Sequence, residues 1–555
     1  MKITLEGSIQ KAVQEYIRRK GIELPGTIDL DLSLTRDTSH GDYATNVAFK
    51  IAKQVKEKPN LVADEIVLLL LNEMEKNQRD TPFERVVVAG GGFINFYLSK
   101  SSLACALAEA HEKDWHFGDS DFGHGRKVLL EFISANPTGP LTIAHGRQAA
   151  VGDAMARVLK KTGHEVTTEY YLNDAGRQMN LLGESLWARY AELSGEEALF
   201  PEEGYKGAYI GELAKKLAEM KGPVLLKETE EERKNVCRDF AKEEMMQWIR
   251  DDIKKLGVQI DHYFSESLLY DKKLVDGALN YLTDQGFLYE KDGALWFRSS
   301  TLGDDKDRVV KKSTGEYTYL APDIAYHRDK FDRGFNWLVN LWGPDHHGYI
   351  SRLKAACRAL GHPADQIDIR IVQLTTLYRK GVPVRMSTRA GEFVTLKELM
   401  DEVGVDATRF FFIMRKIESP LDFDLDLAKE KSQENPVYYL QYAHARIASL
   451  LKYANQPVTA KSNLELLSSK EETDLIKIIT EFSKVLVQTS EMLEPYRLAD
   501  YLRDLATSFH KFYSLHRVVT EDQELTKARL LLVDATRITL RNGLQLLGIS
   551  QPESM

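Results

Sequence analysis

The stretch KVLLEFISANPTGPLTIAHGRQAAVGDAMAR, residues 127–157, decides how the rest of the chain is interpreted. Its apolar run, residues 128–133, predicts a buried strand, and a helix is expected to begin near His145. A strand, a tight loop and a helix in this order present backbone N–H groups and a positive helix end to a phosphate. The loop lacks both GxGxxG and GK[ST], so it is neither a dinucleotide fingerprint nor a P-loop.

The composition is that of a globular protein with several domains. The chain has 555 residues, 43% of them hydrophobic and 28% charged, and single cores stop growing near ~250–300 residues. A net charge of −9 does not by itself indicate a nucleic-acid partner, although basic residues can still gather on one face. Three widely spaced cysteines without a CxxC pair argue against a disulfide framework and a cysteine zinc site. With no apolar run long enough for a bilayer and no signal-peptide pattern, we expect a cytoplasmic protein without a membrane segment.

Three domains are expected. Residues 1–110 predict an α+β domain that ends in a hairpin turning at the GGG of residues 90–92. Residues 111–430 predict a Rossmann-like, doubly wound parallel-sheet domain of the α/β class, with an insertion at about 177–298. Residues 431–555 predict an all-α helical bundle, because apolar residues recur there with a 3.6-residue period.

Strands of the sheet domain are expected at residues 128–133, 165–172, 337–342 and 369–374. Thr395 and Glu398 form a capping box at the start of a later helix. Asp345, His346 and His347 follow one of the strands, and the carboxyl ends of parallel strands are where such sheets bind ligands. A His pair can suggest a metal, but no third ligand has suitable spacing, so no protein-bound metal is predicted.

The bundle contains one stretch of interleaved aromatic and basic residues, 496–517, which suits stacking and phosphate contact with unpaired bases. The alternative is an aromatic core face backed by a basic outer face. The candidate side chains for such contacts are Tyr496, Arg497, Arg503, His510, Lys511 and Arg517.

Two segments about 240 residues apart carry the candidate chemistry: Thr142 with His145 at the helix mouth, and the basic loop RMSTR at residues 385–389. An adenylating enzyme must stabilise charge on ATP phosphates while a carboxylate attacks the α-phosphorus. That needs positioning and cationic or hydrogen-bond donors rather than a protein nucleophile. A histidine at a helix N-terminus and a loop with two arginines and a serine can supply those donors from opposite sides.

LTIAHG resembles the HIGH signature of class I aminoacyl-tRNA synthetases, and RMSTR resembles their KMSKS loop. Longer segments of the sequence resemble arginyl-tRNA synthetase of the bacterial type. The segments that carry this likeness are SHGDYATNVA, GGFINFYL, ANPTGPLxxxHGR, GDDKDRVVKKSTGEYTYLAPDIAYH, GPDHHGYISRLKAA, RAGEFVTL, NPVYYLQYAHAR and LRNGLQLLGIS. The resemblance therefore covers nearly the whole chain.

The resemblance implies a reaction and its partners. Arginine and ATP, with Mg²⁺ on the phosphates, would give arginyl-adenylate and pyrophosphate. The arginyl group would then pass to the 2′-hydroxyl of the terminal adenosine of tRNA(Arg). It also implies that the first domain contacts the tRNA elbow, that the bundle grips the anticodon loop, and that tRNA binds before arginine is activated. Members of the family usually act as monomers.

The resemblance also assigns roles to single residues. The catalytic residues would be Thr142, His145, Arg385, Ser387 and Arg389. ATP would contact Thr142, Ala144, His145, Gly146, Asp345 and Met386. Arginine would contact Glu131, Ser134, Asn136, Tyr319, Asp323 and His347. A guanidinium presents five donors in a planar fork that a carboxylate can accept in a bidentate pair. A site of this kind rejects lysine without an editing domain, and no segment suggests one.

Three positions depart from the family pattern: Thr142 replaces the first histidine of the signature, Ala144 replaces its glycine, and Thr388 replaces the loop lysine. Two other functions are weighed, the second of them because of these departures. One is a class I synthetase for another amino acid, which Tyr319 and Asp323 disfavour. The other is a catalytically impaired relative that still binds tRNA.

Overall fold

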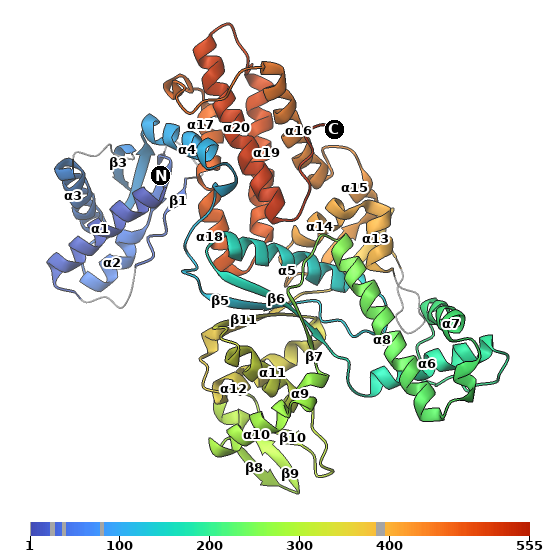
Figure 1. Cartoon of the computed structure of the whole chain (residues 1–555). Helices are drawn as coiled ribbons and strands as arrows, with labels where there is room; N and C mark the ends of the chain where they lie inside the picture. The colour runs from blue at the N-terminus through green and yellow to red at the C-terminus, as the bar shows by residue number, and fades with distance from the viewer. Residues whose placement is uncertain (1, 23–27, 36–39, 78–82, 385–393) are drawn as a thin grey trace.

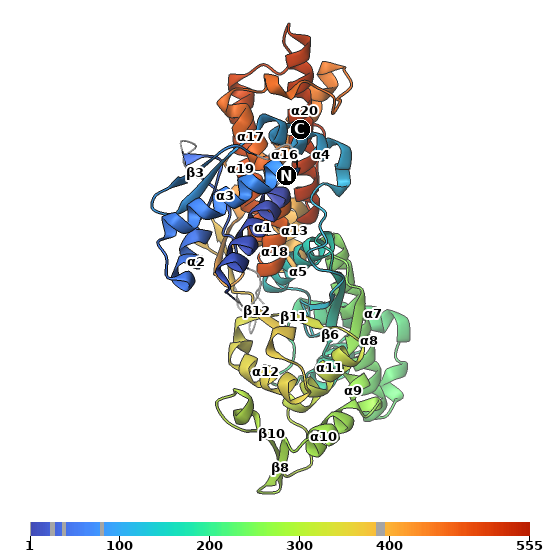
Figure 2. The ribbon, with the colours of Figure 1, turned by 90° about the vertical axis from the view of Figure 1, so that its left-hand side faces the viewer.

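The computed structural model describes residues 2–22, 28–35, 40–77, 83–384 and 394–555 (Figure 1). The fold is an α/β catalytic body that carries an α+β domain at the N-terminus and a helical bundle at the C-terminus, as expected. In two perpendicular views, the bundle and a small sheet near residue 300 lie at opposite ends of the molecule (Figures 1 and 2).

The N-terminal domain packs three helices against an antiparallel sheet of order β1-β2-β4-β3. The elements are α1 (Lys2–Lys20), β1 (Ser33–Leu34), β2 (Tyr43–Thr45), α2 (Val47–Val55), α3 (Pro59–Asn77), β3 (Phe83–Ala89) and β4 (Phe93–Leu98). The expected hairpin is confirmed, with Ala89 paired to Phe93 across the glycine turn. This domain contacts the bundle through β2, where the Tyr43 hydroxyl donates to Glu481 Oε1 at 2.5 Å. Helix α4 (Lys100–Lys113) then leads into the catalytic body.

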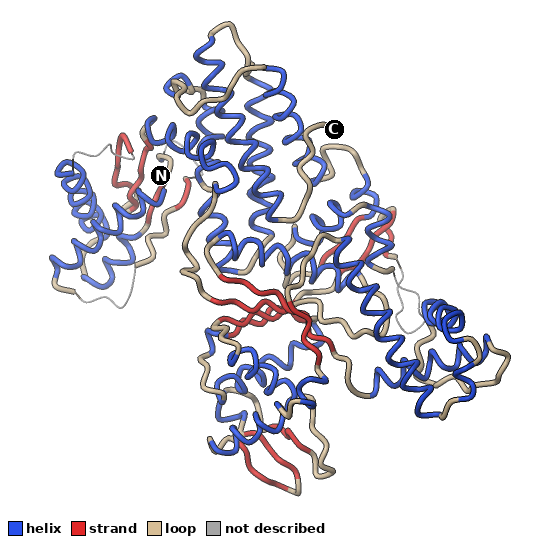
Figure 3. Tube along the Cα trace, in the orientation of Figure 1, coloured by secondary structure: helices blue, strands red, loops and turns tan. Residues whose placement is uncertain are grey.

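The catalytic body is built on five parallel strands in the order β12-β11-β5-β6-β7 (Figure 3). They are β5 (Lys127–Glu131), β6 (Glu165–Leu172), β7 (His262–Ser265), β11 (Trp337–Trp342) and β12 (Ile367–Ile371). Numbered in chain order this is 3-2-1-4-5, the doubly wound order, so the chain reverses direction between β5 and β11. Ligands bind at such a switch point, outside the carboxyl ends of the two strands.

Helices cover both faces of the sheet. The central strands β5 and β11 are therefore buried, and the side chains of Val128, Leu129 and Leu130 are completely buried. Helix α5 (Ile143–Lys161) lies on the face toward the bundle, and α11 (Leu320–Asp332) and α12 (Ile350–Ala359) lie on the opposite face (Figure 1). The predicted helix near His145 is thus confirmed and begins two residues earlier.

The single insertion expected over residues 177–298 is divided in two, because β7 lies within it and belongs to the main sheet. Before β7 stand α6 (Arg177–Leu193), α7 (Ala208–Lys221) and α8 (Glu230–Lys255), which share a separate core. After β7 come α9 (Ser267–Asp271), α10 (Leu274–Asp284), β8 (Leu288–Lys291), β9 (Ala294–Phe297) and β10 (Arg308–Lys311). The sequence did not reveal β7, since four residues are too few to show a period.

A second small sheet, of order β14-β13-β15, joins the catalytic body to the bundle. Its strands and neighbouring helices are β13 (Thr375–Arg379), β14 (Val382–Pro383), α13 (Leu396–Val403), α14 (Val405–Ile413), β15 (Leu421–Asp424) and α15 (Leu425–Lys429). The predicted capping box at the start of α13 is confirmed, because Thr395 Oγ1 accepts from the Glu398 N–H at 3.1 Å and Glu398 Oε2 accepts from the Thr395 N–H at 2.8 Å.

The C-terminal bundle is helical, as its period predicts. Its helices are α16 (Pro436–Ala454), α17 (Lys470–Thr480), α18 (Phe482–Met492), α19 (Tyr496–Leu515) and α20 (Gln523–Leu546). Their apolar faces join the large core that also contains α5 and α14. The bundle is therefore packed directly onto the helix that follows the predicted phosphate loop (Figure 1).

Candidate active site

The chain bends sharply where β5 ends. Ile133 and Ser134 have φ angles of 73° and 40°, in the left-handed region that residues with a side chain adopt at a cost of about 1–2 kcal/mol. The bend lets Ser134 Oγ accept from the Tyr171 N–H at 3.1 Å and donate to Glu131 Oε1 at 3.4 Å. A strained turn at the carboxyl end of a switch-point strand is typical of a ligand-binding loop.

Thr142 is the N-cap of α5 and sets the orientation of His145. The Thr142 N–H lies 3.2 Å from His145 Nδ1, which must accept this hydrogen bond. Nδ1 is therefore unprotonated, and the proton of the neutral imidazole is on Nε2. Desolvation lowers the pKa of His145 to about 4. At neutral pH, His145 is an uncharged Nε2–H donor at the positive end of a helix.

Gly146 allows α5 to pack closely on the next segment of the body. A Cβ at this position would lie 2.5 Å from Leu396 Cδ1 and 3.0 Å from Phe412 Cε2. The same contact continues into the signature loop, where Thr142 pairs with Thr395 and Leu141 O accepts from the Leu396 N–H at 2.8 Å. The helix mouth is thus tied to the start of α13. Ala144, predicted to pack on ATP, is half-buried beside it.

Glu131 lies in a buried polar cluster at the switch point. Lys330 of α11, which is fully buried, donates to Glu131 Oε2 at 2.5 Å and to Asn340 Oδ1 of β11 at 3.2 Å. Asn340 Nδ2 donates in turn to His327 Nε2 at 3.0 Å. The cluster joins β5, β11 and α11 and holds one Glu131 oxygen, while the other faces Ser134.

Asp323 is one helical turn after Tyr319 on α11, and its carboxylate accepts from the Tyr349 hydroxyl at 2.6 Å. The pKa of Asp323 is raised to about 7, chiefly by burial and also by the negative charges of Glu131 and Glu266, while the Tyr349 hydrogen bond and the charge of Lys330 lower it. Burial also raises the pKa of Glu266. The charges of three acidic side chains thus act on one another beside the switch point, and one of the three, Glu131, is paired with Lys330. Such a cluster favours binding of a cation, which would relieve the repulsion.

A neighbouring acid has a structural role. Glu169 of β6 is fully buried, and its two oxygens accept from Arg333 at 2.6 and 2.9 Å. Tyr326 donates to the same carboxylate at 2.7 Å, and His262 Nδ1 lies 2.6 Å from it. The Glu169 carboxylate is thus satisfied by the protein itself and is not offered to a ligand.

The remaining predicted arginine and ATP residues are more exposed. Tyr319 is 84% exposed at the start of α11, so its ring does not contact the cluster in this state. Asn136 Nδ2 donates to Gln178 Oε1 of α6 at 2.6 Å. Asp345 and His347 are exposed on the short 3-10 helix η5 (Pro344–Tyr349). The structure therefore brings Glu131, Ser134 and Asp323 together and leaves these four at the rim.

The predicted closing-loop residues Arg385, Met386, Ser387, Thr388 and Arg389 lie outside the described residues. Among the residues that the structure describes, no group of three or more His, Cys, Asp or Glu side chains is arranged to hold a metal ion. Within the same described ranges, no helix is long and apolar enough to cross a membrane.

The bundle carries a cavity of about 420 Å³ lined by aromatic and cationic side chains. Its lining residues are Tyr442, Ala445, Arg446, Ser449, Leu450, Tyr453, Tyr513 and Met555. The Arg446 guanidinium lies 4.4 Å from the centre of the Tyr513 ring and 5.3 Å from that of Tyr442. Tyr453 is 79% exposed at the edge. Exposed rings beside a guanidinium form a stacking platform for planar groups.

The predicted tRNA-binding residues on α19 divide between surface and interior. His510 is packed among aromatic rings, with Tyr439 at 4.8 Å, and burial lowers its pKa to about 4. Arg497 pairs with Glu494 at 2.6 Å, and Lys511 lies 3.5 Å from Glu471. Tyr501, Phe509 and Phe512 belong to the core, as the alternative interpretation of this stretch requires. The positions of Tyr496, Arg503 and Arg517 are compatible with either interpretation.

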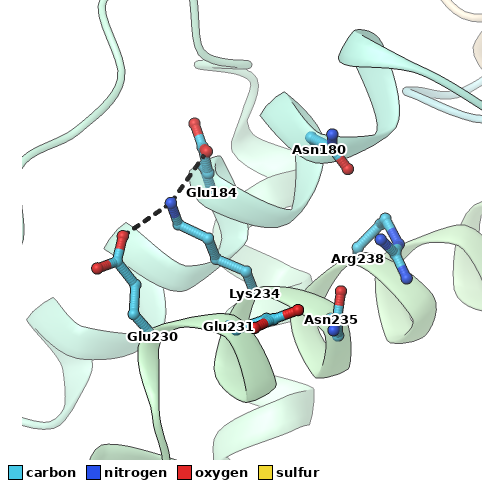
Figure 4. A pocket seen from close by; sticks show the side chains of 7 residues that line it. All are labelled: Asn180, Glu184, Glu230, Glu231, Lys234, Asn235 and Arg238. Carbon is cyan, nitrogen blue, oxygen red and sulfur yellow. Dashed lines mark ion pairs between the residues drawn. The ribbon is translucent and has the colours of Figure 1, made fainter.

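A second cavity, of about 500 Å³, lies on the insertion between α6 and α8 (Figure 4). Its charged side chains largely neutralise one another, because Lys234 lies 2.9 Å from Glu230 and 3.4 Å from Glu184. Arg238 and Asn235 stand beside this pair on α8. No part of this cavity belongs to the switch point, so it is separate from the candidate active site.

Several functional candidates escaped the sequence analysis. Lys330, seven residues after Asp323, lies on the same face of α11, so helical periodicity could have identified it. Glu266, Tyr349 and Asn340 approach the site from distant segments, and only folding brings them there. Tyr442 and Arg446 lie inside the quoted segment NPVYYLQYAHAR, whose spacing of four would have placed them on one helix face.

Family models and known proteins agree with this architecture. The model for the class I (R) tRNA synthetase catalytic domain matches residues 108–416. The arginyl-tRNA synthetase N-terminal domain matches residues 5–98, and the DALR anticodon-binding domain matches residues 440–555. The fold and the site therefore define a class I aminoacyl-tRNA synthetase.

Similar proteins identify the family within the class I synthetases. An arginine–tRNA ligase of Halalkalibacterium halodurans is 43% identical over 99% of each chain. A structure titled putative arginyl-tRNA synthetase from Campylobacter jejuni is 35% identical, covers 82% of this chain and all of its own, and has a TM-score of 0.76. The arginyl-tRNA synthetase of Thermus thermophilus, 23% identical over 99% of both chains with a TM-score of 0.77, shows the shared fold. The chain belongs to the arginyl-tRNA synthetase family.

Proposed function

We propose that the chain is an arginine–tRNA ligase. It activates L-arginine with ATP to arginyl-adenylate and pyrophosphate, and transfers the arginyl group to the 2′-hydroxyl of the terminal adenosine of tRNA(Arg). The observation that carries the proposal is the buried acidic cluster at the switch point, where the Asp323 carboxylate accepts from Tyr349 at 2.6 Å and where burial, together with the charges of Glu131 and Glu266, raises the pKa of Asp323 to about 7. A bound guanidinium relieves that repulsion and gives the acids donors to pair with.

Arginine selection follows from the geometry of its side chain. A carboxylate accepts two N–H groups of a guanidinium in parallel, and this arrangement is unavailable to the single ammonium of lysine. Lysine would leave buried acceptors unpaired, and sites that read hydrogen-bonding groups in this way discriminate by up to about 10⁴–10⁵-fold. In the proposed complex Asp323 and Tyr319 contact the guanidinium, while Glu131, Ser134, Asn136 and His347 complete the arginine site.

The ATP half of the site is proposed at the mouth of α5. His145 Nε2–H and the free N–H groups of the first helical turn donate to phosphate oxygens as charge develops there. The backbone N–H of residue 142 keeps the imidazole in the neutral tautomer that makes this donation, and threonine supplies it as any residue other than proline would. Arg385, Ser387, Arg389 and Met386 are proposed to act on the pyrophosphate side, and Asp345 on the nucleoside. Mg²⁺ enters with ATP as part of the substrate.

The tRNA is proposed to bind along the bundle, with an unpaired anticodon-loop base stacked in the cavity between Tyr442, Tyr513 and Arg446. Stacking of a base on an aromatic side chain is worth about 1–3 kcal/mol, and Arg446 adds a cation next to the phosphate backbone. The α19 residues Tyr496, Arg497, Arg503, His510, Lys511 and Arg517 are the further candidates for this surface.

ATP–pyrophosphate exchange with each amino acid, with and without tRNA, tests the proposal. Exchange with arginine alone, followed by charging of tRNA(Arg), is the expected result. Exchange with a different amino acid would assign the chain to another class I specificity. No exchange in the presence of tRNA would favour a catalytically impaired tRNA-binding relative, the alternative that the departures at Thr142, Ala144 and Thr388 raise. Asp323→Ala should abolish arginine activation, and full activity of that variant would contradict the assigned arginine site.

We further propose that the enzyme acts as a monomer in the cytoplasm. Light scattering coupled to size-exclusion chromatography should give a mass near 63.1 kDa. A mass near twice that value at assay concentrations would contradict the monomer.

A further inference from the structure

Arg147 is the largest fully buried polar side chain near the signature helix mouth, and it lies two residues after His145 on α5. Its guanidinium donates to three backbone carbonyls. Nη1 lies 2.8 Å from Gln373 O and 3.0 Å from Ser419 O, and Nη2 lies 3.1 Å from Lys416 O. The planar fork donates to these carbonyls from two separate nitrogens, whereas the three donors of a lysine ammonium all lie on one nitrogen.

The charge of Arg147 is not matched by an acid. None of its hydrogen-bond partners among the described residues is a carboxylate, and its buried Nε has no partner there. Burial alone lowers the pKa of Arg147 to about 10, so the side chain stays charged at neutral pH. A buried cation without a counter-ion costs free energy that an apolar residue of the same size would avoid. Its presence therefore needs a reason other than stability.

The three carbonyls belong to the two ends of one small sheet. Gln373 precedes β13, and Lys416 and Ser419 form the turn that precedes β15. These strands are parallel neighbours, with Thr375 paired to Leu421. Arg147 therefore holds the start of both strands against α5. Helices α14 and α15 pack on the same sheet, and α13 packs on both of these helices, so the whole unit is anchored at this point.

This anchored unit also contacts the residue that orients His145. Thr395, at the start of α13, pairs with Thr142, and the Thr142 N–H fixes the tautomer of His145. Any tilt of the unit relative to α5 would move Thr142 and, through it, the imidazole. The turn has a second link, because Lys416 Nζ lies 3.2 Å from Glu494 Oε1 of the bundle, and Glu494 also binds Arg497. Arg147 thus sits where the signature helix, the small sheet and the bundle meet.

We propose that Arg147 is a positioning residue for adenylate formation. Its guanidinium sets the spacing between α5 and the sheet β14-β13-β15, and thereby the orientation of His145, without touching a substrate. The inference rests on the proposed function. It requires the shape of the guanidinium as well as its charge, since the carbonyls approach from two directions.

Kinetics of three variants test the inference, with tRNA present throughout. Arg147→Lys keeps the charge and loses the fork, and Arg147→Gln keeps a smaller neutral donor. Arg358→Lys is the matched control: Arg358 is exposed on α12 of the same body, and its guanidinium donates to one carbonyl, Leu302 O, at 2.5 Å. For each variant, kcat and the KM values for ATP and arginine are measured by ATP–pyrophosphate exchange, together with the thermal unfolding midpoint.

The expected result is a fall in kcat on the order of 10²-fold for both Arg147 variants, as for a catalytic group displaced by about 1 Å. The KM for arginine should stay within about twofold because the acidic cluster is untouched. Arg358→Lys should behave as wild type. A wild-type kcat in Arg147→Lys would overturn the role of the fork. If kcat falls only as much as the fraction of folded protein falls, Arg147 has a purely structural role, and this result would also overturn the proposal.

Chemical rescue gives a readout that a purely structural role would not move. Arg147→Gly leaves a cavity of the shape of the side chain, and added guanidinium or methylguanidinium should restore kcat in a saturable manner, whereas ammonium should not. Failure of guanidinium to restore any turnover in folded Arg147→Gly would count against the proposal. If wild-type enzyme gives no exchange, the proposed function itself has failed, and this outcome is recognised before any variant is measured.

Discussion

Lys330 Nζ lies 2.5 Å from Glu131 Oε2, and both side chains are buried beneath the switch point of the sheet. The ammonium also reaches Asn340 Oδ1, so three elements, β5, β11 and α11, meet at one cation. This pair fixes the orientation of Glu131 before any substrate binds. The guanidinium of the substrate then meets an acidic cluster of which one member is already held in place.

Removing the cation should destabilise the protein. Lys330→Met leaves the Glu131 charge buried without its partner, and breaking a buried pair in this way costs about 3–5 kcal/mol. The double variant Glu131→Gln/Lys330→Met should recover part of that loss because no charge is left unpaired. Chemical denaturation measures the free energy of unfolding. The control is Lys312→Met, whose partner Glu316 is exposed, and which should leave stability unchanged. Equal stability of Lys330→Met and wild type would contradict the prediction.

Arginine binding should weaken as the pH falls through 7. Burial raises the pKa of Asp323 to about 7, so its carboxyl is about half protonated at that pH in the free enzyme. The guanidinium binds the ionised form. Affinity is therefore fully present above pH 7 and falls about tenfold per pH unit below it. The KM for arginine between pH 5.5 and 8.5, measured at saturating ATP, should show this inflection.

Tyr349→Phe serves as the matched variant. The Tyr349 hydroxyl donates to Asp323 at 2.6 Å and lowers the pKa of that carboxyl. Its loss should shift the inflection in the KM for arginine to higher pH, while the KM for ATP keeps its own profile. An unchanged inflection would mean that Asp323 is not the titrating group.

Weaker tRNA binding is expected from changes in the bundle cavity. Tyr442→Ala removes one ring of the stacking platform, and Arg446→Ala removes the cation between Tyr442 and Tyr513. Each should raise the dissociation constant for tRNA by about 5- to 150-fold, which corresponds to about 1–3 kcal/mol per stacked base. Filter binding at fixed salt provides the measurement. Lys527→Ala, on α20 and paired with Glu524, is the control. Lys511→Ala then tests whether α19 contributes to tRNA binding. Unchanged tRNA binding in both cavity variants would mean that the anticodon contact lies elsewhere.

The junction between the bundle and α5 depends on Gly548. Its φ is +69°, and a Cβ there would lie 2.3 Å from Arg409 Nη2. Arg409 is itself buried and bound to Asp153 of α5 at 2.5 Å. Gly548→Ala should therefore lower the free energy of unfolding by more than the ~1–2 kcal/mol of left-handed backbone strain. Gly195→Ala separates the two effects, because Gly195 has a similar φ of +79° but nothing within 4 Å. Equal losses in both variants would show that the Arg409 contact has no additional cost.

Periodicity and local motifs predicted most of the fold. The strands at residues 165–172 and 337–342 appear as β6 and β11 with the same bounds, because each is an apolar or β-branched run between clear breakers. The first domain was predicted less well. Residues 28–34 alternate in the way that a strand does, but only Ser33–Leu34 form one, since residues with strand propensity form a strand only when a neighbour pairs with them. Strand β7 is too short to show a period, and only its pairing with β6 defines it as a strand.

The sequence by itself determined the α/β class, the helix mouth with His145, and the likeness to arginyl-tRNA synthetases, because these depend on short segments and local spacing. Only the tertiary structure decided which acidic side chains share a site and which cations pair with them. Glu131, Glu266, Asp323 and Lys330 are spread over 200 residues, and their pKa values and pairing depend on burial and on distances that folding creates. Thr142 illustrates both parts. Its sequence position marks a departure from the signature, and the fold shows that its N–H fixes the neutral tautomer of His145.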